Sequence, residues 1–307
     1  MKASDFELIT TITGSYPTQP EEAKEELISV AIKEAIADQI KAGIRLISDG
    51  QIRDQTRLLA ENINGIEIVD DKPVVVDEIS RPKKPLLHQD YKLAVSYASG
   101  KADVKGIIIG PISFAHQCKL EKTAPYKSNE DIELFYDLAE VLAFEAIALK
   151  KAGAEVIQIN ESILAAIPYL KTARDVINSI AEHIPVPALH VCGSLRGVIE
   201  EILEIDVSVL DIECTKYKNL VLLDRDMVEP YDVRIAFGCI DTSLNEVESI
   251  EVIQERIMQA IERLGEENIW IKPDCGMRNL PREIAFEKLK NMVEATRKIE
   301  KKLFKIR

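Results

Sequence analysis

The stretch VKGIIIG, residues 104–110, is apolar almost throughout, and EVIQI (155–159) and VRIAFG (233–238) repeat the pattern. A strand with one wet face alternates apolar and polar residues, whereas a strand buried on both faces reads as a continuous apolar run. Buried runs bounded by glycine or polar residues are typical of parallel sheets. The sequence therefore predicts an α/β protein with a parallel sheet.

Eight such β segments recur along the 307 residues, and amphipathic helical stretches separate them. The predicted strands are Leu8–Thr13, Ile44–Ser48, Val104–Ile109, Glu155–Ile159, Ala188–Val191, Val207–Ile212, Val233–Phe237 and Asn268–Lys272. The predicted helices include Glu21–Ala42, Asp131–Ala152, Val247–Leu264 and Ile284–Leu303, several with acidic starts and glycine stops. Eight units predict one (β/α)8 TIM barrel over residues 1–307, longer than the usual length of about 250 residues.

The extra length falls in two segments. Gly65–Gln89 follows the second unit, and its three prolines and short VVV run predict a hairpin or cap, about residues 65–90, over one barrel end. Gly110–Asn129 is expected to be irregular. An open doubly wound sheet is the alternative, but it needs a glycine-rich nucleotide turn after its first strand. Thr13–Pro17 lacks that turn, so the barrel is favoured.

Charge and composition exclude several classes of protein. The net charge of −13 offers no dense basic surface for nucleic acid. No apolar run approaches the roughly 20 residues that span a bilayer, which argues against a membrane protein. The first residues lack the layout of a secretory signal, so we expect a cytoplasmic protein. In that reducing compartment the five cysteines are expected to be free thiols, metal ligands or nucleophiles.

Four candidate metal ligands follow the predicted strands, at the edge where barrel enzymes gather their chemistry. His190 and Cys192 are two residues apart and face the same side of an extended strand, while Glu213 and Cys275 end two later strands. Two thiolates, an imidazole and a carboxylate suit Zn²⁺. The spacing alone leaves a second interpretation open, because cysteine is often a small buried apolar residue.

The remaining cysteines, histidines and the one tryptophan are given simpler roles. We expect Cys214 to be structural, Cys239 to pack or to line the mouth, and Trp270 to be core, and we leave Cys118 unassigned. His88 and His183 lie in polar stretches and are expected to be solvated, whereas His116 is a possible substrate contact.

Eight motifs occur in one order along the chain: TTITGSYP (10–17), ISDGQIRD (47–54), GIIIGPIS (106–113), VIQINES (156–162), LHVCGS (189–194), VLDIE (209–213), FGCIDTS (237–243) and IKPDCGMRNLP (271–281). In these motifs the chain resembles the catalytic domain of cobalamin-independent methionine synthases, over essentially its whole length. It is most similar to the short, single-domain archaeal members. The resemblance implies a (β/α)8 methyltransferase that moves a methyl group to the thiolate of L-homocysteine and forms methionine. It also implies zinc on His190, Cys192, Glu213 and Cys275.

The resemblance further implies a substrate site that departs from the long-form enzymes. Thr13, Gly14 and Ser15 correspond to the turn that takes the substrate carboxylate. Gln51 and Asn160 stand where those enzymes have Glu and Asp for the ammonium group, and amides carry no charge to pair it. Glu161 would compensate only if it faced the mouth, and strand alternation points it away. Another small thiol, such as coenzyme M, and a non-catalytic corrinoid-protein partner therefore remain alternatives.

The donor side departs as well. Gln117 occupies the position of a Trp that stacks the folate ring, and Ser243 that of a His that protonates the leaving pterin. These changes favour methylcobalamin or a corrinoid protein as methyl donor, with a methyl-pterin as the second possibility. A polyglutamylated folate would carry charge of the same sign as the protein.

Overall fold

A computed structural model describes residues 8–20, 22 and 24–306 of the chain. The prediction made for the first residues, and the predicted helix start at Glu21, lie outside the described residues. Among those described, we find no helix that combines the length and the apolar character needed to cross a membrane.

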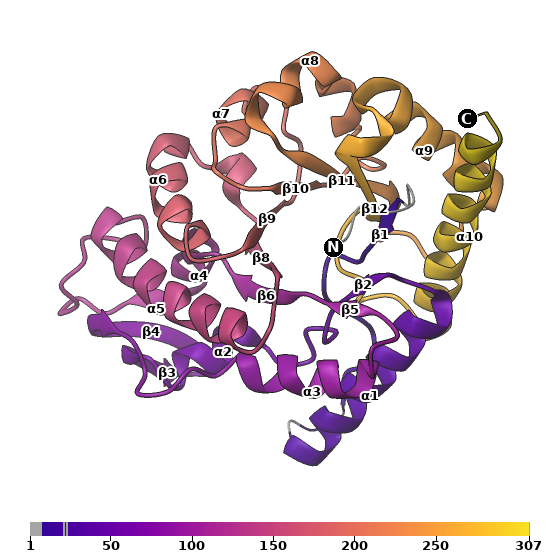
Figure 1. The fold of residues 1–307 in the computed structure, drawn as a ribbon. Coiled ribbons are helices and arrows are strands. Elements are labelled where there is room, and N and C mark those ends of the chain that lie inside the picture. The colour runs from indigo at the N-terminus through magenta and orange to yellow at the C-terminus, as the bar shows by residue number, and fades with distance from the viewer. Residues whose placement is uncertain (1–7, 21, 23, 307) are drawn as a thin grey trace.

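The centre of the molecule is a curled parallel sheet (Figure 1). Seven of its strands are hydrogen-bonded in the order β1-β12-β11-β10-β9-β8-β6. Their bounds are β1 (Ile9–Thr10), β6 (Gly106–Ile109), β8 (Val156–Glu161), β9 (Val186–Val191), β10 (Val209–Ile212), β11 (Arg234–Ile240) and β12 (Ile269–Pro273). Each predicted strand overlaps an observed one. The expected α/β fold with a parallel sheet is confirmed.

The pairing continues beyond this sheet through two short strands. Strand β2 (Leu46–Ile47) pairs in parallel with β5 (Asp103–Val104), which a single residue, Lys105, separates from β6. At the other side of β2, Leu46 forms a parallel bridge with Thr11, just after β1. The pairings therefore return to the strand from which they start.

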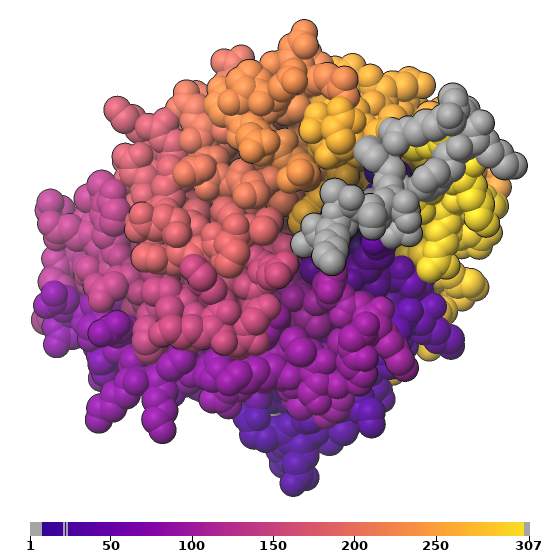
Figure 2. Space-filling model, in the orientation of Figure 1, coloured from indigo at the N-terminus to yellow at the C-terminus, as the bar shows by residue number. Residues whose placement is uncertain are grey.

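Helices surround the sheet (Figure 1). They are α1 (Glu25–Ala42), α2 (Gln55–Ala60), α3 (His88–Ala98), α4 (Pro111–Gln117), α5 (Ile132–Lys151), α6 (Leu170–Ala181), α7 (Ile199–Leu203), α8 (Arg225–Val228), α9 (Ile250–Leu264) and α10 (Arg282–Ile306), with short 3-10 turns at Leu164–Ala166, Asn219–Leu222, Glu229–Tyr231 and Glu266–Asn268. Asp131 caps α5 by accepting from the N–H of Glu133, and Gly43 ends α1 in the left-handed region. The indigo and yellow ends of the chain pack together as α1 and α10 (Figure 2).

The predicted insertion contains a hairpin. Strands β3 (Asn64–Val69) and β4 (Lys72–Ser80) are antiparallel, and β4 pairs with β7 (Lys119–Leu120). The hairpin packs against α2 and α5. Its role as a cap over the barrel end stays a prediction.

The expectation of an irregular segment at Gly110–Asn129 is wrong at its start, because α4 begins at Pro111. Proline at the first helical position needs no hydrogen-bond partner. The buried carboxylate of Glu161 then accepts from the N–H groups of Ile112 and Ser113, both at 2.9 Å. A negative charge at this end of a helix is favourable.

The amino-terminal end of the sheet interior is apolar. Leu46, Val156, Ala188, Val209, Ala236 and Trp270 form a buried cluster there. Residues two further along a strand face the same side. On β8, β9, β10 and β12 these next residues are Gln158, His190, Asp211 and Lys272, and all four are buried. The polar side chains of the sheet interior thus lie toward the carboxyl ends of the strands, and Trp270 is core as predicted.

Candidate metal centre and adjoining pocket

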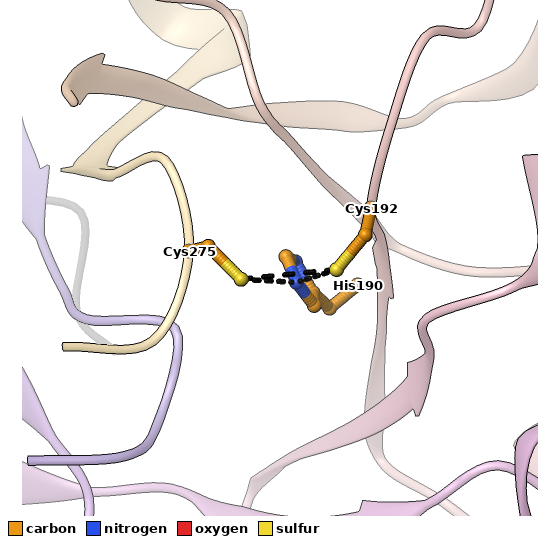
Figure 3. A group of neighbouring side chains, drawn as sticks. All are labelled: His190, Cys192 and Cys275. Carbon is orange, nitrogen blue, oxygen red and sulfur yellow. Dashed lines mark hydrogen bonds between the residues drawn. The ribbon is translucent and has the colours of Figure 1, made fainter. Parts of the chain in front are cut away.

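Three of the four predicted ligands converge at the carboxyl ends of β9 and β12. His190 lies in β9, Cys192 directly follows it, and Cys275 follows β12; their side chains point toward one another (Figure 3). The His190 Nε2 lies 3.1 Å from the Cys192 Sγ and 3.7 Å from the Cys275 Sγ, and the two sulfur atoms lie 3.7 Å apart. One nitrogen and two sulfurs therefore face a common point.

The spacing of these atoms fits a tetrahedral ion. With Zn–S bonds of about 2.3 Å and Zn–N bonds of about 2.0 Å, tetrahedral geometry separates two sulfurs by about 3.8 Å and nitrogen from sulfur by about 3.5 Å. The three observed separations, 3.1, 3.7 and 3.7 Å, lie within about 0.4 Å of those values. The donor set and its geometry are therefore suitable for a metal ion.

Glu213, the fourth predicted ligand, lies just beyond β10 and is 6% exposed. It is not part of the group of three whose ligand atoms lie within 4.8 Å of one another. Burial raises the pKa of its carboxyl to about 7, and the charge of Cys275 adds to the rise. Glu213 therefore belongs to the electrostatic environment of the cluster.

Asp211 orients His190. The His190 Nδ1 lies 2.6 Å from the Asp211 Oδ1, and the Lys272 ammonium pairs with the same oxygen. Burial alone would lower the pKa of His190, but Asp211 raises it to about 9. Burial would likewise raise the pKa of Asp211, but Lys272 and His190 hold it well below its usual range. Asp211 is thus a buried carboxylate between two cationic groups.

The two thiols form a hydrogen-bonded pair. The bond from Cys192 holds the pKa of the Cys275 thiol well below its usual range, and the same bond raises the pKa of Cys192. A lowered thiol pKa favours the thiolate, which is the form that ligates metals.

Two polar residues hold the loops around the cluster. The Asp274 carboxylate accepts from the backbone N–H groups of Cys214 (2.8 Å), Thr215 (3.0 Å) and Lys216 (2.9 Å). The Asn219 amide donates to the carbonyls of Gly193 (2.8 Å) and Glu213 (2.7 Å). These bonds fix the segments that carry Cys192 and Glu213.

A cavity of about 260 Å³ opens beside the cluster, and four of the five predicted substrate residues line it: Thr13, Ser15, Gln51 and Asn160. Gly14 does not line it; a Cβ there would meet the Gln51 Oε1 at 2.1 Å, so this glycine lets Gln51 approach the backbone. His190, Cys192 and Cys275 line the same cavity. The structure thus brings the candidate metal and substrate residues together.

Several lining residues went unnoticed in the sequence. They are Arg53, Asp54, Gln55, Thr56, Ile109, Ser113, Ser162, Gly276 and Arg278. All but Gln55 and Thr56 belong to the recognised motifs, which was the available signal. Gln55 and Thr56 belong to α2, for which the sequence offered no prediction.

The two positions that the sequence analysis compared with residues for the methyl donor, Gln117 and Ser243, lie in different surroundings. Gln117 lines the cavity, and its Oε1 accepts from the Thr56 hydroxyl at 2.7 Å. Ser243 is exposed, and its hydroxyl donates to the Asp241 Oδ1 at 2.6 Å. His116 lies on α4, with its Nδ1 3.0 Å from the Ile112 carbonyl, and is not among the lining residues of this cavity.

Cys214 is buried, as expected of a structural cysteine, and Cys239 is buried and does not line the cavity, so it packs. Cys118, which was left unassigned, is buried too, and burial raises the pKa of each of the three thiols. Glu161 is buried and is not among the residues that line the cavity, in agreement with strand alternation. His88 is an exception: its Nδ1 is buried without a hydrogen-bond partner among the described residues, so it is not simply solvated.

A larger cavity, about 650 Å³, lies at the opposite end of the strands beside Ile9, Leu46, Val156 and Trp270. No cysteine or histidine lines it among the described residues. The candidate metal ligands line the smaller cavity instead.

The fold and the cluster define an α/β protein with a thiolate-rich candidate metal site at the carboxyl ends of its parallel strands. The chain belongs to the family described as the catalytic domain of cobalamin-independent synthases, whose model matches residues 8–298.

Two archaeal relatives match along nearly their whole length. A protein named methionine synthase from Methanothermobacter thermautotrophicus is 38% identical, covering 94% of this chain and 99% of the relative. One of the same name from Methanocaldococcus jannaschii is also 38% identical, covering 95% and 100%. Among solved structures, a B12-independent methionine synthase from Shewanella sp. W3-18-1 superposes with a TM-score of 0.83 at 21% identity, covering 97% of this chain and 99% of that one. That likeness supports the fold.

Proposed function

We propose that this protein is a single-domain, zinc-dependent (β/α)8 methyltransferase that transfers a methyl group to the thiolate of L-homocysteine and forms methionine. The cluster of His190, Cys192 and Cys275 beside a cavity carries the proposal, in a chain of this family. Full-length relatives named methionine synthase favour homocysteine over another small thiol.

We assign the metal to His190, Cys192 and Cys275, with Glu213 as the fourth ligand. The fit of the three donor atoms to a tetrahedron supports the first three, and the proximity of Glu213 to the charge of Cys275 supports the fourth. Bound Zn²⁺ would lower the pKa of the substrate thiol, which makes the sulfur a nucleophile near neutral pH. Two thiolates and a carboxylate would leave the site with a formal charge of about −1.

The surrounding residues prepare this site. Asp211 lies on the Nδ1 side of His190, so the Nε2 faces the two sulfurs and would become the ligand atom once an ion displaces its proton. Lys272 offsets the charge of Asp211 and also donates to the Asp274 carbonyl at 2.8 Å. Asp211 and Lys272 thereby fix the orientation of the His190 ring.

The cavity residues would position the acceptor. Methyl transfer is a direct displacement, so its rate depends on holding the sulfur in line with the methyl carbon and its leaving group, not on a general base. Thr13, Ser15, Gln51 and Asn160 line the cavity beside the cluster and are proposed to bind the amino-acid end of homocysteine.

For the donor we propose methylcobalamin or a corrinoid protein, with a methyl-pterin as second candidate. No Trp, Tyr or Phe is found among the described residues lining the cavity, and Gln117 stands at the position expected to stack a ring. A flat pterin would therefore lack an aromatic partner.

A turnover assay tests this function. Zinc-loaded protein is offered L-homocysteine with methylcobalamin, and separately with methyl-pterins, and methionine is measured by mass spectrometry. We expect methionine from the parent and from Cys118→Ala, whose thiol is buried away from the cluster, and none from Cys275→Ser. Absence of methionine with every donor would reject the proposal.

A further inference from the structure

Lys272 places an ammonium group inside the sheet, behind the metal cluster. Its side chain is 0% exposed, and its Nζ lies 3.3 Å from the hydroxyl of Thr13. Burial alone would lower the pKa of Lys272, but Asp211 raises it, so the group stays charged near neutral pH. Lys272 is not among the residues that line the cavity of the cluster. A molecule in that cavity would therefore experience the charge of Lys272 without touching its side chain.

The contacts of this ammonium reach both sides of the cluster. It pairs with the Asp211 Oδ1, the same oxygen that lies 2.6 Å from the His190 Nδ1. It also donates to the carbonyl of Asp274 at 2.8 Å, on the residue that precedes Cys275. His190 and Cys275 point toward each other in the cluster (Figure 3). The charge of Lys272 is thus held in one place behind both ligands.

A second buried ammonium of the interior, Lys105, is less suited to supply a lasting charge. It bonds to the Gln158 Oε1 at 2.5 Å, on β8. Burial lowers its pKa to about 7, and the charge of Lys272 acts in the same direction. At about pH 8 a group with that pKa is mostly neutral. Lys272 therefore remains the charged lysine beside Asp211.

The negative charge near Lys272 would grow when the substrate binds. Two thiolates and the Glu213 carboxylate around Zn²⁺ give a formal charge of about −1, and a bound substrate thiolate would bring it to about −2. Asp211 adds a further negative charge directly behind His190. A positive charge at Lys272 has opposite effects on the two ligands of the site, because it repels the zinc cation and attracts the anionic sulfur.

We infer that Lys272 lowers the affinity of the site for zinc and raises the affinity of the zinc-loaded site for the substrate thiolate. The inference rests on the proposed function and adds a residue that favours an anionic acceptor by its charge alone. Loss of a residue with a purely structural role would weaken both affinities. Loss of Lys272 should change them in opposite directions.

Two kinds of affinity are measured for each variant at the same pH, above the pKa of Lys105. Competition with a chromogenic chelator gives the affinity for zinc. Calorimetry on zinc-loaded protein gives the Kd of L-homocysteine and of L-methionine, whose sulfur carries no charge, so the ratio of the two reports the effect of the sulfur's charge. Lys288→Met is the matched control, because Lys288 is also 0% exposed and pairs with Glu248 at 2.7 Å, but lies on α10.

We expect Lys272→Met to bind zinc about tenfold more tightly and homocysteine about tenfold more weakly, with methionine and the Lys288→Met control within about twofold of the parent. Asp211→Asn leaves the ammonium unopposed, so it should bind zinc more weakly and homocysteine more tightly relative to methionine.

The double variant Asp211→Asn/Lys272→Met gives a second comparison. Measured against Asp211→Asn, it differs only in Lys272 and contains no Asp211 carboxyl that could take up a proton in place of the lost cation. It should show tighter zinc and weaker homocysteine binding than Asp211→Asn. This comparison holds even if Lys272→Met alone does not fold.

Weaker binding of both zinc and homocysteine in the two comparisons would show a structural role and overturn the inference, and so would a ratio of the two Kd values that neither comparison changes. If the parent forms methionine while either result is found, the inference fails and the proposed function stands. If the parent neither binds nor methylates homocysteine, both fail.

Discussion

His190 and Asp211 occupy directly paired positions on β9 and β10, and their side chains meet with the His190 Nδ1 2.6 Å from the Asp211 Oδ1. The register of the sheet itself therefore fixes the direction of a candidate metal ligand. Since successive side chains of a strand point to opposite faces, a slip of one residue would turn His190 out of the interior.

Asp211→Asn is expected to lower zinc affinity by about 10- to 100-fold, because an amide is a weaker partner for the imidazole N–H and no longer neutralises Lys272. Competition with a fluorescent chelator measures the change. Asp226→Asn, an exposed residue of α8, is the matched control and should bind zinc like the parent. Equal affinity in both variants would contradict the orienting role.

Four of the five cysteines should divide into two sets. Cys192→Ser and Cys275→Ser are expected to lose bound zinc, whereas Cys118→Ala and Cys239→Ala should retain one ion per chain. Buried thiols with raised pKa values stay protonated and unreactive at neutral pH. Metal analysis after gel filtration measures the bound zinc. Alkylation with iodoacetamide, with and without zinc as protection, measures the reactivity of the thiols. Zinc retained by both serine variants would place the metal elsewhere.

Lys105→Met should change how stability depends on pH. Burial lowers the pKa of Lys105 to about 7, so above pH 7 the unfolded chain binds more protons at this position than the folded chain. Stability of the parent therefore gains about 2 kcal/mol from Lys105 between pH 7 and 9, and the variant lacks that gain.

Urea unfolding at pH 7 and 9 measures the free energy of unfolding of variant and parent. Contributions from the other titrating groups cancel in the difference between the two proteins. Lys101→Met, at an exposed position, should track the parent at both pH values. A Lys105→Met difference that does not change with pH would show that Lys105 stays charged.

Gly238→Ala should disturb the loop that follows Glu213. A Cβ at Gly238 would lie 2.2 Å from the Asp274 Oδ1 and 2.9 Å from the Ile212 carbonyl oxygen, so Asp274 must move from the N–H groups it holds. We expect a loss of about 1–3 kcal/mol in the free energy of unfolding, with weaker zinc binding.

Gly106→Ala is the control for that variant, since its Cβ would meet only Leu149 and Ile157 side-chain atoms at 3.2 Å or more. Denaturant unfolding and zinc competition should therefore show larger losses of stability and zinc affinity in Gly238→Ala than in Gly106→Ala. Similar losses in the two variants would argue against the anchoring role of Asp274.

Much of the fold and of the metal cluster follows from local pattern. Apolar runs such as VKGIIIG predict buried parallel strands, and the two-residue period of a strand places His190 and Cys192 on one side. Cys275 is 83 residues from Cys192, and only the curling of the sheet brings the two sulfurs to 3.7 Å. The prediction that Cys275 lies near Cys192 therefore depended on the number of predicted strands, which implied a barrel.

The buried charges behind the cluster were not predicted, although the sequence contains their signal. Asp211 and Lys272 interrupt otherwise apolar strands, and a charge inside a buried strand requires a partner. Which charge pairs with which depends on register, and pattern alone does not give register. Helix α4 was missed for a similar reason: Glu161, far along the chain, completes its first turn.

The most direct test of the metal site is X-ray absorption at the zinc edge, on protein loaded with one ion, before and after L-homocysteine is added. The account predicts two sulfur neighbours with nitrogen or oxygen completing the shell, and a third sulfur when homocysteine is present. A spectrum without sulfur neighbours, or one that homocysteine leaves unchanged, would contradict it.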